Sequence, residues 1–528
     1  MNAAGATRRS IAVLSAFALL VCAAGASAET IPPDSWVYEA LRSFELRGLV
    51  VLEPTFPYTR DRIETYVREI ARGASSDGVE LGARQRFLLE RLEREFDGKG
   101  GRPEDRDDRP ALTIRDGERF AAIDAAAGGA ILKRVDRARG EANGLGEVAM
   151  LAGFGRGITM ETNYRLVMAP ERGDNVDGGK PGPRARSFRG LSGELERALV
   201  AANGSWWEVR VGREYVHWGG DDGEGLIVSR SAGSLDHAGG IVRIGRFALS
   251  TFQSALGPDF NLPYLSRYLA GHRLTAALPR GVFVGVSETV LYGGTGLEWA
   301  YLMPIGIFYA AQANERTNSD NVLYSFDVKA PLGRGVVLSA ELLVDDVQYE
   351  RGGDAGPDRI AFTIGIDAQR VAGGRDYGLA ARYAYVDIYT YEHEYMRSPG
   401  SVHTSYVAGN GRYPTNALLG SSLGPDADRW DLALSCGASE RIDCRFEASF
   451  IRRGEGNGLR PWYPGRERNP PFPSGEVLRE TRLGAFCSYD LGRGSRVAAG
   501  GGARLLDGGP ADLDSADGFA RLELVLDL

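Results

Sequence analysis

Beyond about residue 115 the chain alternates apolar and polar residues with a period of two, and no other feature constrains its fold as strongly. In the last segment, one set of alternate positions holds Leu522, Leu524, Leu526 and Leu528, and the other holds Arg521, Glu523 and Asp527. Segments 322–328, 338–344 and 444–450 show the same alternation. Because successive side chains of a β-strand point to opposite faces, each segment predicts a strand with one apolar and one polar face.

The first residues have the features of an export signal. Arg8 and Arg9 precede an apolar run over 11–24, and Ala26-Ser27-Ala28 matches a small-x-small cleavage site. A membrane anchor is disfavoured because the run is shorter than the ~20 residues that a spanning helix needs. We therefore expect residues 1–28 to be a signal peptide and the mature protein to leave the cytoplasm.

Two architectures can use such alternating strands in an exported protein. A soluble sandwich would need many separate domains for a sheet this long, and no linkers divide it. A membrane barrel needs an apolar outer band and a polar interior, and it must close on itself to satisfy its backbone in lipid. We predict a mainly β fold: a transmembrane antiparallel β-barrel of about 18 strands over 111–528, in the outer membrane of a Gram-negative bacterium.

The connections between the predicted strands alternate between tight and long, as they do in outer-membrane barrels. The tight ones are 155–157, 203–204, 279–281, 332–335 and 492–494. The long ones are 170–187, 218–238, 293–321, 389–428 and 453–475. If the N-terminal region lies in the periplasm, every long connection falls on the outer side.

Residues 29–110 have a helical period instead. Asp34 or Ser35 can cap a first helix that ends near Gly48, and two more amphipathic helices follow Thr59 and begin near Leu81. The charged stretch 100–110 reads as a linker. We predict a small α-helical domain in the periplasm, whose apolar stripes pack on one another or on the inner mouth of the barrel.

The net charge of −8 disfavours a nucleic-acid partner. Of the four cysteines, Cys436, Cys444 and Cys487 lie beyond the expected cleavage site. Either Cys436 and Cys444 form a bridge across a hairpin, or the thiols are free.

The stretch 211–230, "VGREYVHWGGDDGEGLIVSR", combines charged, aromatic and glycine residues. Its glycines lack the spacing of a phosphate-binding loop. The alternation places Arg210 and Glu214 in the lumen, and we interpret the rest as an external loop at the barrel rim. Trp206-Trp207 and Tyr215–Trp218 fit aromatic girdles at the two membrane interfaces. No nucleophile elbow and no metal-ligand spacing accompany His217, so we expect no catalytic residues, no metal and no cofactor.

A second polar group lies on one predicted hairpin. His272 and Arg273 begin one strand, and Glu288 and Tyr292 lie on the next. We expect a lumen polar cluster, which either stiffens the barrel or lines a path for a saccharide. Trp299, in the connection that follows, either stacks on a sugar or anchors the outer interface, and so does Tyr301.

Three blocks of the chain resemble the Wzi-type capsule assembly family. They are "VGREYVHWGG" (211–220), "YLAGHRLTAALPRGVFVGVSETVLYGG" (268–294) and "LEWAYLMPIGIFYAAQANERTNSDNVLYSFDVK" (297–329), and "WVYEALRSFELRGLV" near the N-terminus also fits. The resemblance implies an outer-membrane barrel with helices at its periplasmic side. It also implies a lectin-like role in binding or anchoring surface polysaccharide, capsular or exopolysaccharide, during capsule assembly.

Two long external connections carry the side chains that suit a saccharide, because flat aromatic faces and arginines recognise sugars and acidic groups. The candidates are Trp462, Tyr463, Arg460, Arg466, Tyr395 and Arg397. The alternative is that these residues pack the loops into a lid.

We expect surface polysaccharide and outer-membrane lipids as partners of a monomer that is not an enzyme. The alternative function is a porin or channel whose helical region binds the cell wall, since residues 36–60 also resemble one S-layer-homology repeat.

Overall fold

The structure is a computed structural model of the chain. It describes residues 27–75, 79–96, 103–134, 141–155, 157–168, 191–219, 225–257, 266–293, 296–312, 320–333, 335–346, 356–392, 406–410, 413–458, 462–463, 465–509 and 514–527.

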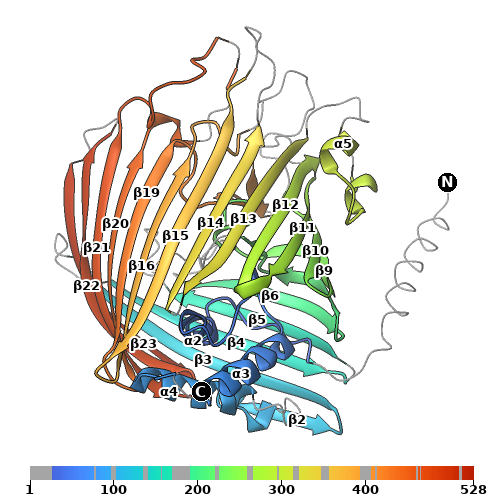
Figure 1. The fold of residues 1–528 in the computed structure, drawn as a ribbon, viewed down its shortest axis with the longest axis vertical. Coiled ribbons are helices and arrows are strands. Elements are labelled where there is room, and N and C mark those ends of the chain that lie inside the picture. Colours follow the sequence, from blue (N-terminus) through green and yellow to red (C-terminus); the bar gives the residue numbers. More distant parts are fainter. Residues whose placement is uncertain are drawn as a thin grey trace.

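Within these residues, eighteen antiparallel strands form a closed barrel (Figure 1). The barrel closes where β23 pairs with β3, from Phe519 opposite Arg134 to Asp527 opposite Ala126. The strands are β3 (Arg119–Arg134), β4 (Glu141–Gly153), β5 (Ile158–Met168), β6 (Leu191–Asn203), β7 (Trp207–Glu214), β9 (Leu235–Ile244), β10 (Phe247–Ala255), β11 (Arg267–Leu278), β12 (Val282–Gly293), β13 (Asn321–Gly333), β14 (Val336–Asp346), β15 (Arg359–Ala372), β16 (Arg375–Val386), β19 (Ala427–Gly437), β20 (Ile442–Arg453), β21 (Leu478–Gly492), β22 (Ser495–Gly508) and β23 (Ser515–Asp527).

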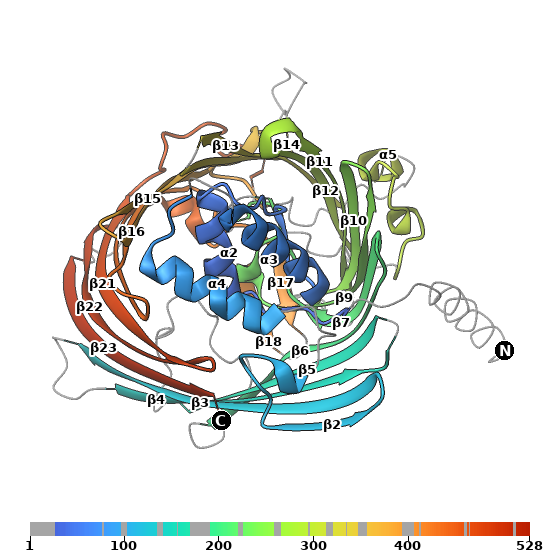
Figure 2. The same cartoon turned by 60° about the horizontal axis from the view of Figure 1, so that its bottom comes forward.

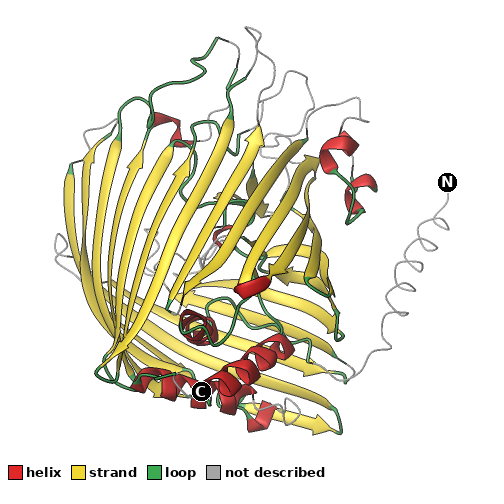
Figure 3. Cartoon of the chain, in the orientation of Figure 1, coloured by secondary structure: helices red, strands yellow, loops and turns green. Residues whose placement is uncertain are grey.

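The remaining strands are not part of this ring of eighteen. β2 (Leu112–Asp116) pairs only with the start of β3. The ladder β17 (Val407–Asn410) with β18 (Tyr413–Leu418) forms a separate small sheet. Strand colours in Figure 3 show that β-structure dominates the chain. The predicted fold class and strand number are therefore confirmed.

The two faces of the wall follow the alternation in the sequence. Leu522, Leu524 and Leu526 are exposed on the outer face of β23. Their neighbours Arg521 and Glu523 form an ion pair of 2.6 Å on the inner face. Because closure pairs every strand on both edges, the outer face can meet lipid without unsatisfied backbone groups.

The tight connections gather at one end of the barrel and the long ones at the other. Glycines with positive φ form several tight turns, among them Gly155 (φ 71°) and Gly281 (φ 76°). In outer-membrane barrels the short turns face the periplasm and the long loops face outward. We use "inner mouth" for the end with tight turns and "outer mouth" for the other.

Three helices fill the inner mouth, as Figure 2 shows: α2 (Trp36–Leu46), α3 (Arg60–Ala74) and α4 (Ala83–Phe96). The Ser35 side chain caps α2, and the three apolar stripes form one core that contains Leu41, Ile63 and Leu92. Ion pairs to the barrel hold this core in place: Arg42 with Asp367 (2.5 Å), Lys329 with Glu45 (2.7 Å), and Arg91 with Asp490 (2.9 Å). In the described residues, no helix is both long and apolar enough to span a membrane.

The stretch that reads as a charged linker is instead pinned to the helices. Arg106 is buried and pairs with Glu29 (2.6 Å), and Asp107 and Asp108 both pair with Arg91 (3.0 Å each). Its charges are therefore structural, because each one in these pairs neutralises a charge on α4 or on Glu29 near the N-terminus.

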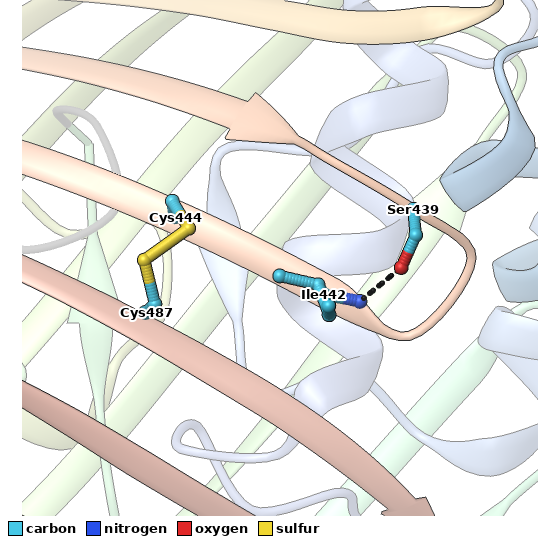
Figure 4. The surroundings of a disulfide bond; sticks show 4 residues. All are labelled: Ser439, Ile442, Cys444 and Cys487. Atoms are coloured by element: carbon cyan, nitrogen blue, oxygen red, sulfur yellow. Dashed lines mark hydrogen bonds between the residues drawn. A yellow bond between two sulfur atoms is a disulfide. The ribbon is translucent and has the colours of Figure 1, made fainter.

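The disulfide joins Cys444 to Cys487 and leaves Cys436 as a free thiol, so neither alternative from the sequence, a Cys436–Cys444 bridge or three free thiols, is correct (Figure 4). Cys444 on β20 lies opposite Cys436 on β19 and opposite Cys487 on β21. Cys444 lies on the middle one of three strands, so it has a possible partner on each side. The hairpin in the sequence indicates only the partner on β19. The three sulfurs share the outer face with Phe446 and Phe450.

Candidate functional site

The segment that follows β7 folds into the lumen, so the predicted external rim is wrong. Its short strand β8 (His217–Trp218) pairs with β1 (Thr55–Phe56) from the N-terminal region. His217 is fully buried and stacks on Phe56 at 4.2 Å between ring centroids. Of the three tryptophans predicted at the girdles, only Trp206 is exposed, because Trp207 and Trp218 are buried, and Tyr215 is partly buried. The apolar side chains of this segment are buried because they pack against other residues inside the barrel.

The connection between β16 and β19 also turns inward and binds this segment. Tyr391 donates a hydrogen bond to the Leu226 carbonyl (2.7 Å), and Tyr406 donates one to the Ile227 carbonyl (2.8 Å). The Ser229 backbone N–H donates to the carbonyl of Leu419 (2.8 Å). We call the described residues of 215–234, 387–392, 406 and 418–426 the loop plug.

The loop plug packs against one side of the inner wall. Glu341 on β14 accepts hydrogen bonds from the Leu226 N–H (3.0 Å) and from Ser325 Oγ (2.7 Å). Gly271 leaves room for the Trp218 ring, since a Cβ there would lie 3.0 Å from it. We call this inner face of β10–β16 and β19 the covered wall. Its buried apolar residues include Phe252, Leu269, Leu291, Leu323 and Leu343.

Three of the residues predicted in the lumen polar cluster do lie in the lumen. Arg210 donates to the carbonyl of Pro57 (2.9 Å). Glu214 accepts from Thr30 Oγ1 (2.7 Å) and pairs with Arg197 (2.8 Å). Arg273 is fully buried and pairs with Asp327 (2.6 Å). These contacts fix the wall to itself and to the N-terminal region, as the stiffening hypothesis requires.

His272, Glu288 and Tyr292 lie on the outer face, so their predicted place in the lumen is wrong. They alternate in phase with Leu274 and Val286, which are exposed on the outside. Adjacent strand residues point to opposite faces, so His272 and Arg273 cannot share one. The short helix α5 (Phe308–Gln312) covers this outer group.

The predicted aromatic loop residues split into a packed one and an exposed one. Trp462 is only 7% exposed, packs against Ile388 and Tyr389, and donates from Nε1 to the Arg466 carbonyl (3.1 Å). The Arg466 guanidinium lies 5.4 Å from the centroid of the Tyr389 ring. Tyr463 is 61% exposed and presents its ring to solvent. Arg460, Tyr395 and Arg397 lie outside the described residues.

One buried carboxylate ties this outer loop to the barrel. Asp426 accepts hydrogen bonds from the backbone N–H groups of Ser474 (2.9 Å) and Gly456 (2.8 Å). Burial raises the pKa of Asp426, although the Ser474 and Gly456 hydrogen bonds act against this. The loop over 454–475 is therefore fixed at both ends beside the outer mouth.

An arginine cluster on the inner wall, near the same mouth, has no counterpart in the sequence-based candidates. Glu480 on β21 is almost fully buried and binds three guanidinium groups: Arg453 (2.7 Å), Arg482 (2.7 Å) and Arg504 (2.6 Å). Arg482 and Arg504 lie directly opposite each other on β21 and β22. Their side chains are 53% and 43% exposed. One carboxylate serves three cations, so the cluster has an excess of positive charge toward the lumen.

Two aromatic rings lie deeper on the same wall. Phe486 and Phe519 are half-buried, with ring centroids 6.3 Å apart and planes at 31°. They lie over glycines: a Cβ on Gly500 would meet the Phe486 ring at 2.4 Å, and one on Gly502 would meet the Phe519 ring at 2.9 Å. We call this inner face of β20–β23 the open wall. The glycine run 500–502 and the inward arginines were visible in the sequence, but only the register brings them together.

The open wall combines cations with flat apolar rings, which is the chemistry that binds an acidic saccharide. No group of three His, Cys, Asp or Glu side chains in the described part of the chain is arranged to hold a metal ion.

Solved structures of known proteins are similar to this chain. By structure, the chain is similar to Wzi, a carbohydrate-binding outer-membrane β-barrel involved in group 1 capsule assembly in Escherichia coli, with 14% identity, a TM-score of 0.59, and coverage of 94% of this chain and 99% of that one. It is also similar to the Pseudomonas aeruginosa protein OccD3, with 10% identity, a TM-score of 0.44, and coverage of 80% and 93%. No curated protein matches by sequence.

The sequence profile of capsule assembly protein Wzi matches residues 117–503, which is most of the barrel. The earlier resemblance is thereby confirmed, and the outer membrane is the location of such a barrel. The chain belongs to the Wzi capsule assembly family.

Proposed function

We propose that this protein binds an acidic surface polysaccharide at its open wall and holds it at the outer mouth during capsule assembly, without catalysing a reaction. The observation that carries the proposal is the cluster of three arginines on one glutamate, two of them exposed, above the rings of Phe486 and Phe519. The Escherichia coli relative is itself a carbohydrate-binding barrel.

The geometry suits a uronate or another anionic sugar. Each guanidinium uses one nitrogen for Glu480, and exposed Arg482 and Arg504 retain donors that face the lumen. Arginine forks match carboxylates, and such charge-assisted bonds are stronger than neutral ones. The apolar face of a neighbouring sugar ring can lie against Phe486 or Phe519. Tyr463, in the connection between β20 and β21, is exposed and offers a further ring to a saccharide.

Isothermal titration with an oligouronate and with a neutral oligoglucan of equal length tests the proposal. We expect the double variant Arg482→Gln with Arg504→Gln to weaken oligouronate binding about 10- to 100-fold, as loss of two charge-assisted bonds would. Arg479→Gln is the matched control, because Arg479 lies on the same strand and pairs with Asp507 (3.4 Å) on the opposite face. If both variants bind as wild type does, the open wall is not the site.

The channel hypothesis needs a continuous aqueous path through the lumen. Helices α2–α4 fill the inner mouth and the loop plug covers one wall, which supports low conductance. We expect single-channel recordings of the monomeric protein to show only rare openings. Steady conductance would favour the porin alternative.

A further inference from the structure

One segment of the chain lies outside the barrel. Residues 296–312, with the turn η4 (Ala300–Leu302) and helix α5, run along the outer surface beside β11 and β12 (Figures 1 and 2). Tyr301 packs on Tyr292 with 4.8 Å between ring centroids, and its hydroxyl donates to Asp320 (2.6 Å). We call residues 296–312 the outer segment.

A polar clasp fixes the outer segment to the wall. The Glu288 carboxylate accepts hydrogen bonds from the backbone N–H groups of Phe308 and Tyr309, both at 3.0 Å, and from His272 Nε2 at 3.0 Å. The Phe308 ring lies 4.3 Å from the His272 ring and is almost fully buried. Polar groups on the lipid side of a barrel are costly unless they are covered and hydrogen-bonded. The outer segment provides both the cover and the donors.

The other side of the outer segment is apolar and faces away from the protein. Trp299 is 74% exposed and Ile305 is 77% exposed. Between 296 and 312 the only charged side chain is Glu298. The other large exposed residues are Leu297, Leu302, Met303, Ile307 and Tyr309.

This apolar surface continues the lipid-facing band of the barrel. Leu274, Val286 and Phe326 are exposed on the outer faces of the strands next to the clasp, on the side toward the inner mouth. The outer segment covers the next positions toward the outer mouth and presents apolar side chains in the same direction. A soluble surface rarely exposes such a patch, and contact with lipid explains it.

We propose that the outer segment is a membrane-embedded element that inserts Trp299, Ile305 and Ile307 among the acyl chains of the outer leaflet, on the β11–β13 side of the barrel. The Glu288–His272 clasp sets its position. The barrel therefore contacts the leaflet asymmetrically, with a protruding apolar ridge on one flank.

Tryptophan quenching tests this proposal on the full-length protein in phosphatidylcholine vesicles, with and without brominated acyl chains. The contribution of Trp299 is the difference between wild type and Trp299→Phe, and Trp36→Phe serves as the control because Trp36 lies in the helices at the inner mouth. We expect brominated chains to quench the Trp299 contribution by more than half, while aqueous iodide leaves it unchanged.

Two outcomes would overturn the proposal. Quenching of Trp299 by iodide would place the outer segment above the membrane. Protection from both quenchers, at a lipid excess that isolates single barrels, would mean that protein covers it. Glu288→Gln tests the clasp separately: we expect altered quenching of Trp299 with unchanged quenching of Trp430, which is also exposed on the outer face.

Discussion

The two sides of the inner wall near the outer mouth differ in what lines them and in what covers them. The covered wall carries leucines and phenylalanine toward the lumen, and the loop plug buries them. The open wall carries arginines, glycines and two half-buried rings, and Arg482 and Arg504 remain exposed. Apolar side chains on an inner wall are stabilised when other residues cover them and exclude water. A charged wall is stable when it is hydrated, so it remains accessible to a ligand.

The two sides of the inner wall have different roles. The covered wall stabilises the inward loops and narrows the lumen. The open wall offers the charges and flat surfaces that an acidic saccharide needs. Mutations on the covered wall should therefore change stability, and mutations on the open wall should change binding.

The largest effect is expected on the covered wall. Leu291→Ala removes a fully buried side chain under the loop plug and should lower the unfolding free energy by about 2 to 5 kcal/mol. Phe519→Ala on the open wall should cost clearly less, because the ring is already half-exposed. Urea titrations in lipid vesicles measure both, and equal losses would contradict the division into two walls.

Both walls are inner faces of strands, and a charged residue introduced on the outer face of a strand tests which face is which. Leu524→Arg places a cation in the lipid-facing band and should cost about 2 to 4 kcal/mol near the middle of the membrane. Glu523→Gln, one residue earlier and facing the lumen, should cost much less. The same urea titrations measure both losses of unfolding free energy. A larger loss for Glu523→Gln than for Leu524→Arg would mean that the inner and outer faces are exchanged.

The helices beneath both walls should loosen in acid. Glu29 is buried, and burial raises its pKa, but Arg106 and Arg60 outweigh burial and lower it from 4.5 to about 2. The stabilisation is therefore fully present above pH 4.5 and is lost as the pH falls toward 2, by on the order of 3 kcal/mol. Near-ultraviolet circular dichroism follows the stacked Tyr38 and Tyr58 rings. Glu29→Gln should remove the transition in this window, and an unchanged acid transition would assign it to another group.

The smallest effect concerns the hydrogen bonds within the loop plug. Tyr391→Phe and Tyr406→Phe each remove a donor to a plug carbonyl and should cost about 1 kcal/mol each. Single-channel recordings should show more frequent openings, while oligouronate binding at the open wall stays constant. A parallel loss of binding would show that the two walls are coupled.

Much of the architecture could be predicted from local patterns. The period of two in β23, the glycine turns and the alternation of connection lengths are properties of neighbouring residues, and they sufficed for the barrel and its eighteen strands. The helices α2–α4 follow from caps and apolar stripes. The division of the chain at residue 110 and the cleavage after Ala28 remain predictions.

The site was predicted less well, because its parts meet across strands. Trp462 suggested an exposed sugar platform, but it is buried in its loop, while Tyr463 beside it is exposed. Arg453, Arg482 and Arg504 come from three strands and converge on Glu480 only through the register. The direction in which a long loop folds depends on whether the lumen offers apolar cover, which no local pattern reports.

By itself the sequence determined which residues of clearly alternating strands such as β23 face lipid and which face the lumen, because the pleat of a strand enforces that alternation wherever one face must be apolar. On β11 and β12 it did not, since polar His272 and Glu288 lie on the outer face. It also determined the helical region and the family. Only the tertiary structure decided that 215–234 turns inward, that Cys444 pairs with Cys487, and that Glu288 and His272 clasp a segment outside the barrel. Each of these depends on a neighbour distant in the chain, and closure of the barrel is what makes the two residues neighbours.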